Sequence, residues 1–113
     1  MKKEYKNWIG KNIHIVIDRK IGSSHPDYPE TKYELNYGYI PNTVAGDGEP
    51  IDAYVIGDDN PLDEFEGIVI AIVERKNDDE FKLVVADTDK YGKEDIMDKV
   101  KFQEKYFKSK IIK

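Results

Sequence analysis

Hydrophobic positions along the chain predict a mostly β protein. In residues 13–17, Ile-His-Ile-Val-Ile, three isoleucines fall on one face of a strand, and His14 falls on the other face as an exposed histidine. Residues 67–73, Gly-Ile-Val-Ile-Ala-Ile-Val, show no polar alternation, which is typical of a central strand buried on both faces. Residues 81–85 follow a charged turn, so we expect them to form the return partner of that central strand.

Two shorter strands are expected at residues 36–40 and 53–56, joined by an acidic turn. Gly46 and Gly48 allow positive φ and Pro50 fixes the exit, so the turn should be rigid. The carboxylates that it carries are Asp47, Glu49 and Asp52. Three carboxylates brought this close repel one another unless a cation offsets them, and Mg²⁺ and Ca²⁺ prefer such oxygen ligands. The spacing does not fit an EF-hand loop, and the residues alone leave a cation site and a solvated acidic turn both open.

The hydrophobic period changes after Lys93. Ile96, Met97, Val100 and Phe107 recur at helical spacing, which predicts an amphipathic C-terminal helix packed on the strands. The lysines at positions 105, 108 and 110 would then suit the negative end of the helix dipole.

Composition narrows the function classes. A chain of 113 residues is expected to form a single domain over residues 1–113. Its net charge of −5 disfavours non-specific nucleic-acid binding, and the absence of cysteine excludes a disulfide framework, a thiolate metal site and a cysteine nucleophile. The sequence has no apolar run of the length that a signal peptide or a membrane span needs. We therefore expect a soluble, cytoplasmic protein with no nucleic-acid or membrane partner.

Two motifs give the chain a family resemblance. Asn-Tyr-Gly-Tyr-Ile-Pro begins at Asn36, and Asp-Gly-Glu-Pro-Ile-Asp runs from Asp47 to Asp52. Together they resemble the signature of soluble family I inorganic pyrophosphatases, Asn-Tyr-Gly-Phe/Tyr-Ile followed by Asp-Gly-Asp-Pro-x-Asp. The resemblance implies a mainly β (α+β) fold, a small closed OB-like β-barrel of about five strands with a C-terminal amphipathic helix. It also implies a small-molecule substrate, pyrophosphate, hydrolysed to two phosphates with Mg²⁺.

The resemblance also implies a set of site residues. Asp47, Asp52 and Tyr37 correspond to catalytic positions, and the implied metal ligands are Asp47, Glu49, Asp52 and Asp79. Phosphate would be bound by Arg19, Tyr37, Lys82 and Tyr106. Glu74, and Asp79 or Glu80, occupy positions similar to a pair of family aspartates. In this mechanism two or more Mg²⁺ ions lower the pKa of a bridging water, while the basic and hydroxyl groups hold the phosphate oxygens.

Some positions depart from the family pattern. Nothing before Ile17 matches the early hairpin that carries a metal-binding glutamate and a phosphate-binding lysine in the family, and Lys108 is displaced by one residue from a family lysine. Residues 22–32 look like an insertion, in which Ser23, Ser24 and His25 could either face an anion or form a plain loop. Two alternative functions therefore stay open: a hydrolase of nucleotide or sugar diphosphates, and a non-catalytic metal- or phosphate-binding protein of the same fold. The family commonly assembles, so a homo-oligomer is a further candidate, with Trp8 or Phe107 at its interface.

Overall fold

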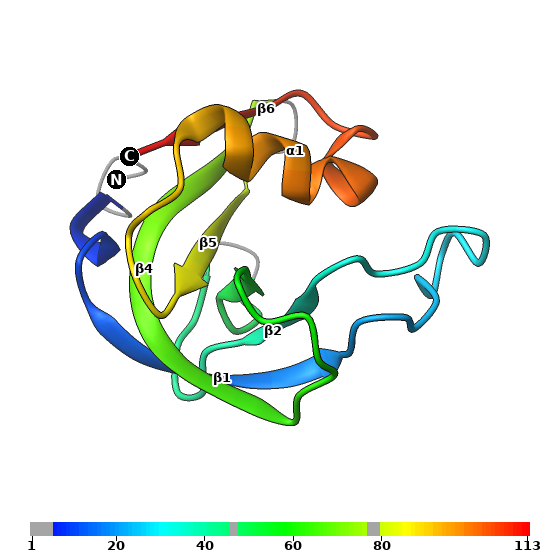
Figure 1. Cartoon of the computed structure of the whole chain (residues 1–113), viewed down its shortest axis with the longest axis horizontal. Coiled ribbons are helices and arrows are strands. Elements are labelled where there is room, and N and C mark those ends of the chain that lie inside the picture. The colour runs from blue at the N-terminus through cyan, green and yellow to red at the C-terminus, as the bar shows by residue number, and fades with distance from the viewer. Residues whose placement is uncertain (1–5, 46–47, 77–79) are drawn as a thin grey trace.

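The computed structural model describes residues 6–45, 48–76 and 80–113. Within those residues the strands are β1 (Asn12–Arg19), β2 (Asn36–Tyr39), β3 (Asp52–Val55), β4 (Glu64–Arg75), β5 (Phe81–Ala86) and β6 (Ser109–Ile112), and the helix is α1 (Lys93–Glu104) (Figure 1). The structure is therefore mainly β with one α-helix in the described part of the chain, as the hydrophobic pattern predicts.

Five of the strands close into a ring. β1 pairs antiparallel with both β2 and β4, β2 pairs antiparallel with β3, β3 lies parallel to β5, and β5 pairs antiparallel with β4. β4 can take part at two places because it is 12 residues long: its start lies against β1, and its later part lies against β5. Figure 1 shows β4 as one long, curved strand. The expected closed fold of about five strands is confirmed.

The strands carry two hydrophobic cores, one on each face. In β3 and β5, Ala53, Val55, Leu83 and Val85 belong to one cluster, whereas their neighbours Tyr54 and Val84 belong to the other. The second cluster also contains Ile96, Val100 and Phe102 of α1, so it fills the space between the helix and the sheet. Since both faces are covered, β4 and β5 are long apolar runs rather than alternating ones.

The end of the chain differs from the sequence prediction. The helix begins after Gly92, ends at Glu104, and does not reach Phe107. Residues 109–112 form β6, which extends the sheet antiparallel to β4 with Val73 opposite Ile111. Lys108 and Lys110 are therefore not helical residues, and the prediction that they suit the helix dipole was wrong. No helix in residues 6–45, 48–76 or 80–113 has the combination of length and apolarity that a membrane crossing requires.

The surroundings of Phe107 explain why the helical spacing of apolar residues predicted too long a helix. Its ring lies 3.7 Å from the Arg75 guanidinium carbon, so a buried cation of β4 covers this aromatic side chain, instead of a further turn of the helix. A periodic apolar residue reports only that its side chain is covered, and here the cover comes from another part of the chain.

Candidate active site

A cavity of about 410 Å³ lies where several strand ends meet the loop after β1. The residues that line it are Asp18, Arg19, His25, Pro26, Asp27, Tyr28, Tyr33, Tyr37, Asp52, Arg75, Glu80, Lys82, Gln103 and Phe107. The fold brings them together from β1, β2, β3, β4, β5, the helix and the connecting loops. Most of these side chains are charged or aromatic, which suits a charged ligand better than an apolar one.

Lys82 lies on one wall of this cavity between two carboxylates. Its ammonium nitrogen is 2.9 Å from Asp52 Oδ2 and 3.2 Å from Glu80 Oε1, and its side chain is buried. Asp52 begins β3 and Lys82 is the second residue of β5. Because β3 and β5 are parallel neighbours, their first residues lie at the same edge of the sheet, which places the two side chains in contact.

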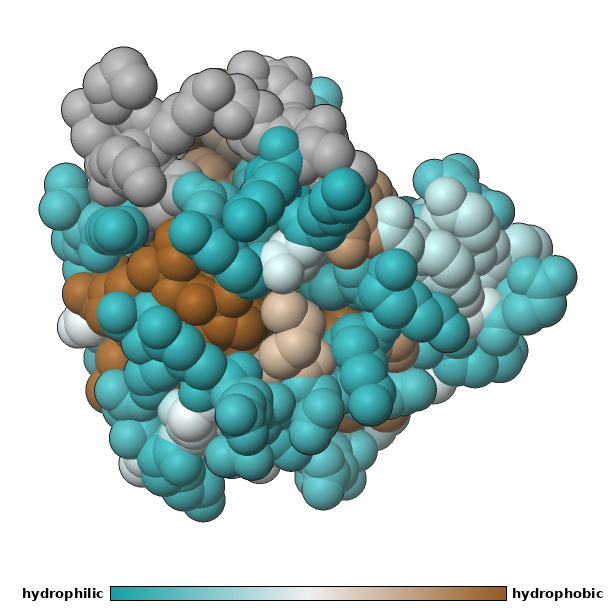
Figure 2. Space-filling view, turned by 90° about the horizontal axis from the view of Figure 1, so that it is seen from above, coloured by the Kyte–Doolittle hydropathy of each residue, from teal (hydrophilic) through white to brown (hydrophobic). Residues whose placement is uncertain are grey.

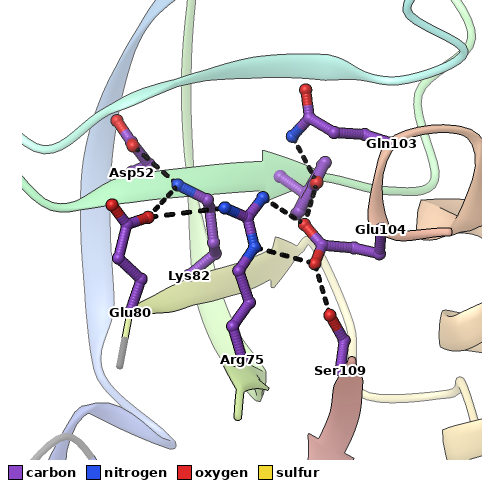
Figure 3. A network of polar contacts seen from close by, with 8 residues as sticks. Asp52, Arg75, Glu80, Lys82, Gln103, Glu104 and Ser109 are labelled. Atoms are coloured by element: carbon purple, nitrogen blue, oxygen red, sulfur yellow. Dashed lines mark hydrogen bonds and ion pairs between the residues drawn. The ribbon is translucent and has the colours of Figure 1, made fainter. Parts of the chain in front are cut away.

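A second group of hydrogen-bonded and ion-paired residues surrounds Arg75 (Figure 3). Arg75 donates from Nε to Glu104 Oε1 at 3.0 Å and from Nη2 to Glu104 Oε2 at 2.8 Å, and its Nη1 lies 3.5 Å from Glu80 Oε1. Glu104 also accepts hydrogen bonds from Tyr54 Oη at 2.6 Å and from Ser109 Oγ at 2.6 Å. The network joins β3, β4, α1 and β6, so it fixes the position of the helix end against the sheet.

The buried groups in this network are shifted in their titration. Burial alone would raise the pKa of Glu104, but hydrogen bonds from Arg75, Ser109 and Tyr54 lower it below its usual value. Burial, and then the Glu104 charge, raise the pKa of Tyr54 well above its usual value. Burial alone would lower the pKa of Arg75, yet Glu104 raises it. Arg75 and Glu104 therefore stay a charged pair throughout the physiological range.

The described cavity lining carries more negative than positive groups. Its carboxylates are Asp18, Asp27, Asp52 and Glu80, and its permanent cations are Arg19, Arg75 and Lys82. Glu104 already neutralises Arg75. Burial raises the pKa of Asp18, with Arg19 opposing and Asp52 adding to the rise. An anionic ligand would be repelled here unless added cations accompanied it, and carboxylates are the donors that a hard divalent cation prefers. The donor set therefore fits a metal-dependent anion site.

The predicted metal ligands are only partly within the described residues. Asp47 and Asp79 lie outside them. Asp52 lines the cavity, whereas Glu49 is exposed and does not line it. Among residues 6–45, 48–76 and 80–113, no three acidic or histidine side chains gather closely enough to hold an ion. The four-residue ligand set stays a prediction.

The predicted phosphate-binding residues divide into two groups. Arg19, Tyr37 and Lys82 all line the cavity. Burial, and then the charge of Asp52, raise the pKa of Tyr37 well above its usual value. Tyr106 does not line the cavity, and its hydroxyl lies 2.9 Å from that of Thr31. Its role as a phosphate ligand stays a prediction.

Several residues of the cavity and of the buried network beside it went unrecognised in the sequence, although a signal was present for two residues of that network, Glu104 and Arg75. Glu104 follows Val100 by four residues and Ile96 by eight, so it lies on the apolar stripe of α1. Arg75 follows the buried Val73 by two residues and shares its strand face. Charged residues at core positions are rare unless they are paired, so both positions indicate a buried partner.

Glu74, placed by resemblance near the site, instead pairs with Lys110 of β6 at 3.5 Å.

Comparison with known proteins gives consistent results. A family model described as inorganic pyrophosphatase matches residues 3–111. A curated inorganic pyrophosphatase of Helicobacter pylori is 40% identical over 50 residues, which cover 42% of this chain and 29% of that protein. One from Nostoc sp. is 48% identical over 44 residues, which cover 39% of this chain and 24% of that protein. The matched segments thus span less than a third of the length of these curated relatives.

Solved structures show the same fold. The crystal structure of inorganic pyrophosphatase from Ehrlichia chaffeensis superposes with a TM-score of 0.68 at 18% identity, covering 89% of this chain and 84% of that one. The Helicobacter pylori pyrophosphatase structure gives a TM-score of 0.64 at 19% identity, covering 90% and 81%. At these identities the likeness establishes the fold alone.

Proposed function

Because the chain belongs to the inorganic pyrophosphatase family, we propose that it hydrolyses pyrophosphate to two phosphates in the cytoplasm, with Mg²⁺ as its cofactor. The observation that carries this proposal is the single cavity that Arg19, Tyr37, Lys82 and Asp52 line together. These residues combine phosphate-binding donors with an excess of metal-binding acceptors in one place.

Three side chains would bind and orient the substrate. Lys82 uses two of its ammonium hydrogens for Asp52 and Glu80, so the third can be donated to a phosphate oxygen. Arg19 donates one N–H to the Asp18 carbonyl at 3.1 Å and has further donors in the fork geometry that matches phosphate. The Tyr37 hydroxyl lines the cavity beside them and would donate to the same anion. Together they would stabilise negative charge as it moves to the leaving phosphate.

Carboxylates would hold the metal. We propose Asp47, Asp52 and Asp79, with Glu49, as the ligands, and Asp47 and Asp52 together with Tyr37 as catalytic residues. Bound Mg²⁺ would supply charge neutralisation and a more acidic water. Of the two described members of this set, Asp52 lines the cavity and Glu49 does not, and the Asp52 carboxylate accepts a hydrogen bond from Lys82 at 2.9 Å.

The test is the variant Asp52→Asn, assayed for phosphate release from pyrophosphate with and without MgCl₂. We expect Mg²⁺-dependent release to fall about 100-fold or more, because a ligand that also orients Lys82 is lost. Asp59→Asn is the matched control: it removes one exposed carboxylate that does not line the cavity, and its release should stay within about twofold of wild type. Unchanged turnover in Asp52→Asn would contradict the proposal.

The same assay separates the alternative substrates. A nucleoside diphosphate and a sugar nucleotide, supplied in place of pyrophosphate, should release phosphate more slowly than pyrophosphate does.

The homo-oligomer stays a prediction. Light scattering on the purified chain would measure its mass in solution and so test it.

A further inference from the structure

Residues 22–33, which contain the segment 22–32 that looks like an insertion in the sequence, form a hairpin. Gly22 N–H donates to the Tyr33 carbonyl at 2.8 Å, Tyr33 N–H donates to the Ser23 carbonyl at 2.8 Å, and His25 N–H donates to the Thr31 carbonyl at 2.9 Å. Ser24 and Lys32 form an antiparallel bridge. The hairpin projects from the body of the molecule at the right of Figures 1 and 2. Its composition is polar, and the three backbone hydrogen bonds above join its two arms.

The hairpin contacts Tyr106, the second residue after the end of α1. The ring of Tyr28 stacks on that of Tyr106, with centroids 4.7 Å apart and planes 9° from parallel. The hydroxyls of Thr31 and Tyr106 are 2.9 Å apart, which is hydrogen-bonding distance. We call Tyr28, Thr31 and Tyr106 the clasp. It holds the hairpin at two points, so the hairpin should not swing freely away from the cavity.

His25 lies on the hairpin where it lines the cavity. Its ring stacks on Tyr33, with centroids 5.7 Å apart and planes 4° from parallel. Its Nδ1 accepts a hydrogen bond from Asp27 N–H at 3.0 Å, so the neutral ring carries its proton on Nε2. No residue of the described chain accepts a hydrogen bond from that Nε2–H. The hairpin thus places His25, with an N–H donor that no described residue uses, in the lining of a cavity whose described carboxylates outnumber its permanent cations.

We propose that His25 binds the substrate, donating Nε2–H to an oxygen of the diphosphate, and that the clasp positions it. The inference rests on the proposed function for the identity of the ligand. A neutral donor suits this place because it bonds to an anion without displacing the carboxylates that would hold a metal. On this account Tyr106 is a positioning residue, acting through Thr31 and Tyr28.

Two substitutions at position 25 separate the donor from the hairpin. In His25→Asn the side-chain oxygen can still accept from Asp27 N–H, as in an Asx-turn, but the Nε2 donor is lost. In His25→Gln the amide nitrogen can take the place of Nε2. We would titrate each variant calorimetrically with methylenediphosphonate, a diphosphate analogue that cannot be hydrolysed at its bridge, in MgCl₂. We expect His25→Asn to bind about fivefold more weakly than wild type, and His25→Gln to stay within about twofold of it.

The clasp is tested with Thr31→Val and Tyr106→Phe, which remove the two hydroxyls separately. Both should weaken analogue binding by a similar factor, and the double variant should be no weaker than either. Both should also speed hydrogen exchange at the His25 amide, whose bond to Thr31 closes the hairpin. If Tyr106→Phe weakens binding while Thr31→Val does not, Tyr106 contacts the ligand directly and the clasp is refuted.

The outcomes keep this inference apart from the proposed function. Wild-type affinity in His25→Asn, or equal weakening in His25→Gln, overturns the role of His25, as does a wild-type chain that does not bind the analogue. His25-dependent binding by a wild-type chain that releases no phosphate supports the inference and refutes pyrophosphate hydrolysis. Full turnover with His25→Asn indistinguishable from wild type refutes the inference alone.

Discussion

At the scale of single residues, the buried ion pair of Arg75 and Glu104 has the largest expected effect on stability. Arg75 is 7% exposed and Glu104 is 2% exposed, so neither charge is solvated by bulk water. Their two-pronged contact, with hydrogen bonds from Tyr54 and Ser109, replaces that solvation. A pair of this kind adds little net stability over an apolar pair, but breaking it leaves one charge buried without compensation.

We predict that Glu104→Gln lowers the free energy of unfolding by about 3–5 kcal/mol at neutral pH, since the guanidinium of Arg75 loses its main counter-charge. Urea unfolding followed by circular dichroism measures this. Asp98→Asn is the control, because Asp98 is an exposed partner of Lys101 on the same helix and should change stability by no more than about 0.5 kcal/mol. A loss of under about 1 kcal/mol in Glu104→Gln would mean that the pair is not a structural requirement.

The dependence of stability on pH also follows from Glu104. The folded-state pKa of Glu104 is lowered from its ordinary 4.5, so its contribution is fully present above about pH 5. That contribution is lost as the pH falls through the folded-state value. The stability difference between wild type and Glu104→Gln should therefore shrink as the pH is lowered from about 5 toward 3. A difference that stays constant over that range would show that protonation of Glu104 is not responsible.

At the scale of elements, β6 is the strand that the helical spacing of apolar residues did not predict. It adds a strand to β4 beyond the closed ring, and Ile111 turns into the core that α1 also covers. Ser109, its first residue, donates to Glu104 at the end of α1. The helix and the last strand are therefore fixed by each other, and neither should be stable without the other.

We predict that Ile111→Ala destabilises the protein by about 2–4 kcal/mol, because Ile111 is 8% exposed and its removal leaves a cavity between α1 and β4. Lys110→Ala tests the strand period, since the neighbouring side chain is exposed and should cost no more than about 0.5 kcal/mol. Thermal and urea unfolding of both variants measure the difference. Equal effects at the two positions would argue against a strand there.

At the scale of the whole molecule, the two cores are not independent. β3, β4 and β5 contribute residues to both, so neither core can be opened without disturbing strands that the other needs. Trp8 packs against one core, and α1 packs against the other. The chain should therefore unfold as one unit.

The prediction at this scale is a single unfolding transition. Fluorescence of Trp8, the one tryptophan in the sequence, reports on one core, and far-ultraviolet circular dichroism of α1 reports on the other. The two urea transitions should coincide within experimental error. Separate midpoints would show that the helix and its core unfold independently of the ring.

The sequence by itself determined those features that depend on local pattern. The apolar runs at 67–73 and 81–85 predicted the central strand pair, and the motifs from Asn36 to Asp52 indicated the family. The resemblance to that family then implied one site with Tyr37, Asp52, Arg19 and Lys82. Periodicity and motif spacing are carried by residues near one another in the chain, so they can be read without the fold. In the structure these four residues do line one cavity.

Only the tertiary structure decided which distant groups meet. The same apolar spacing fits a helix that reaches Phe107 and a helix that stops at Glu104, and the fold shows that Phe107 lies beyond the helix and packs on the Arg75 guanidinium. The partner of a buried charge, such as Glu104 for Arg75, and the tether of a hairpin, such as Tyr106 for Thr31, lie 29 and 75 residues away in the chain. Periodicity shows that Arg75 and Glu104 occupy core positions, but it does not show which distant group each one meets, because that depends on how the folded chain brings its elements together.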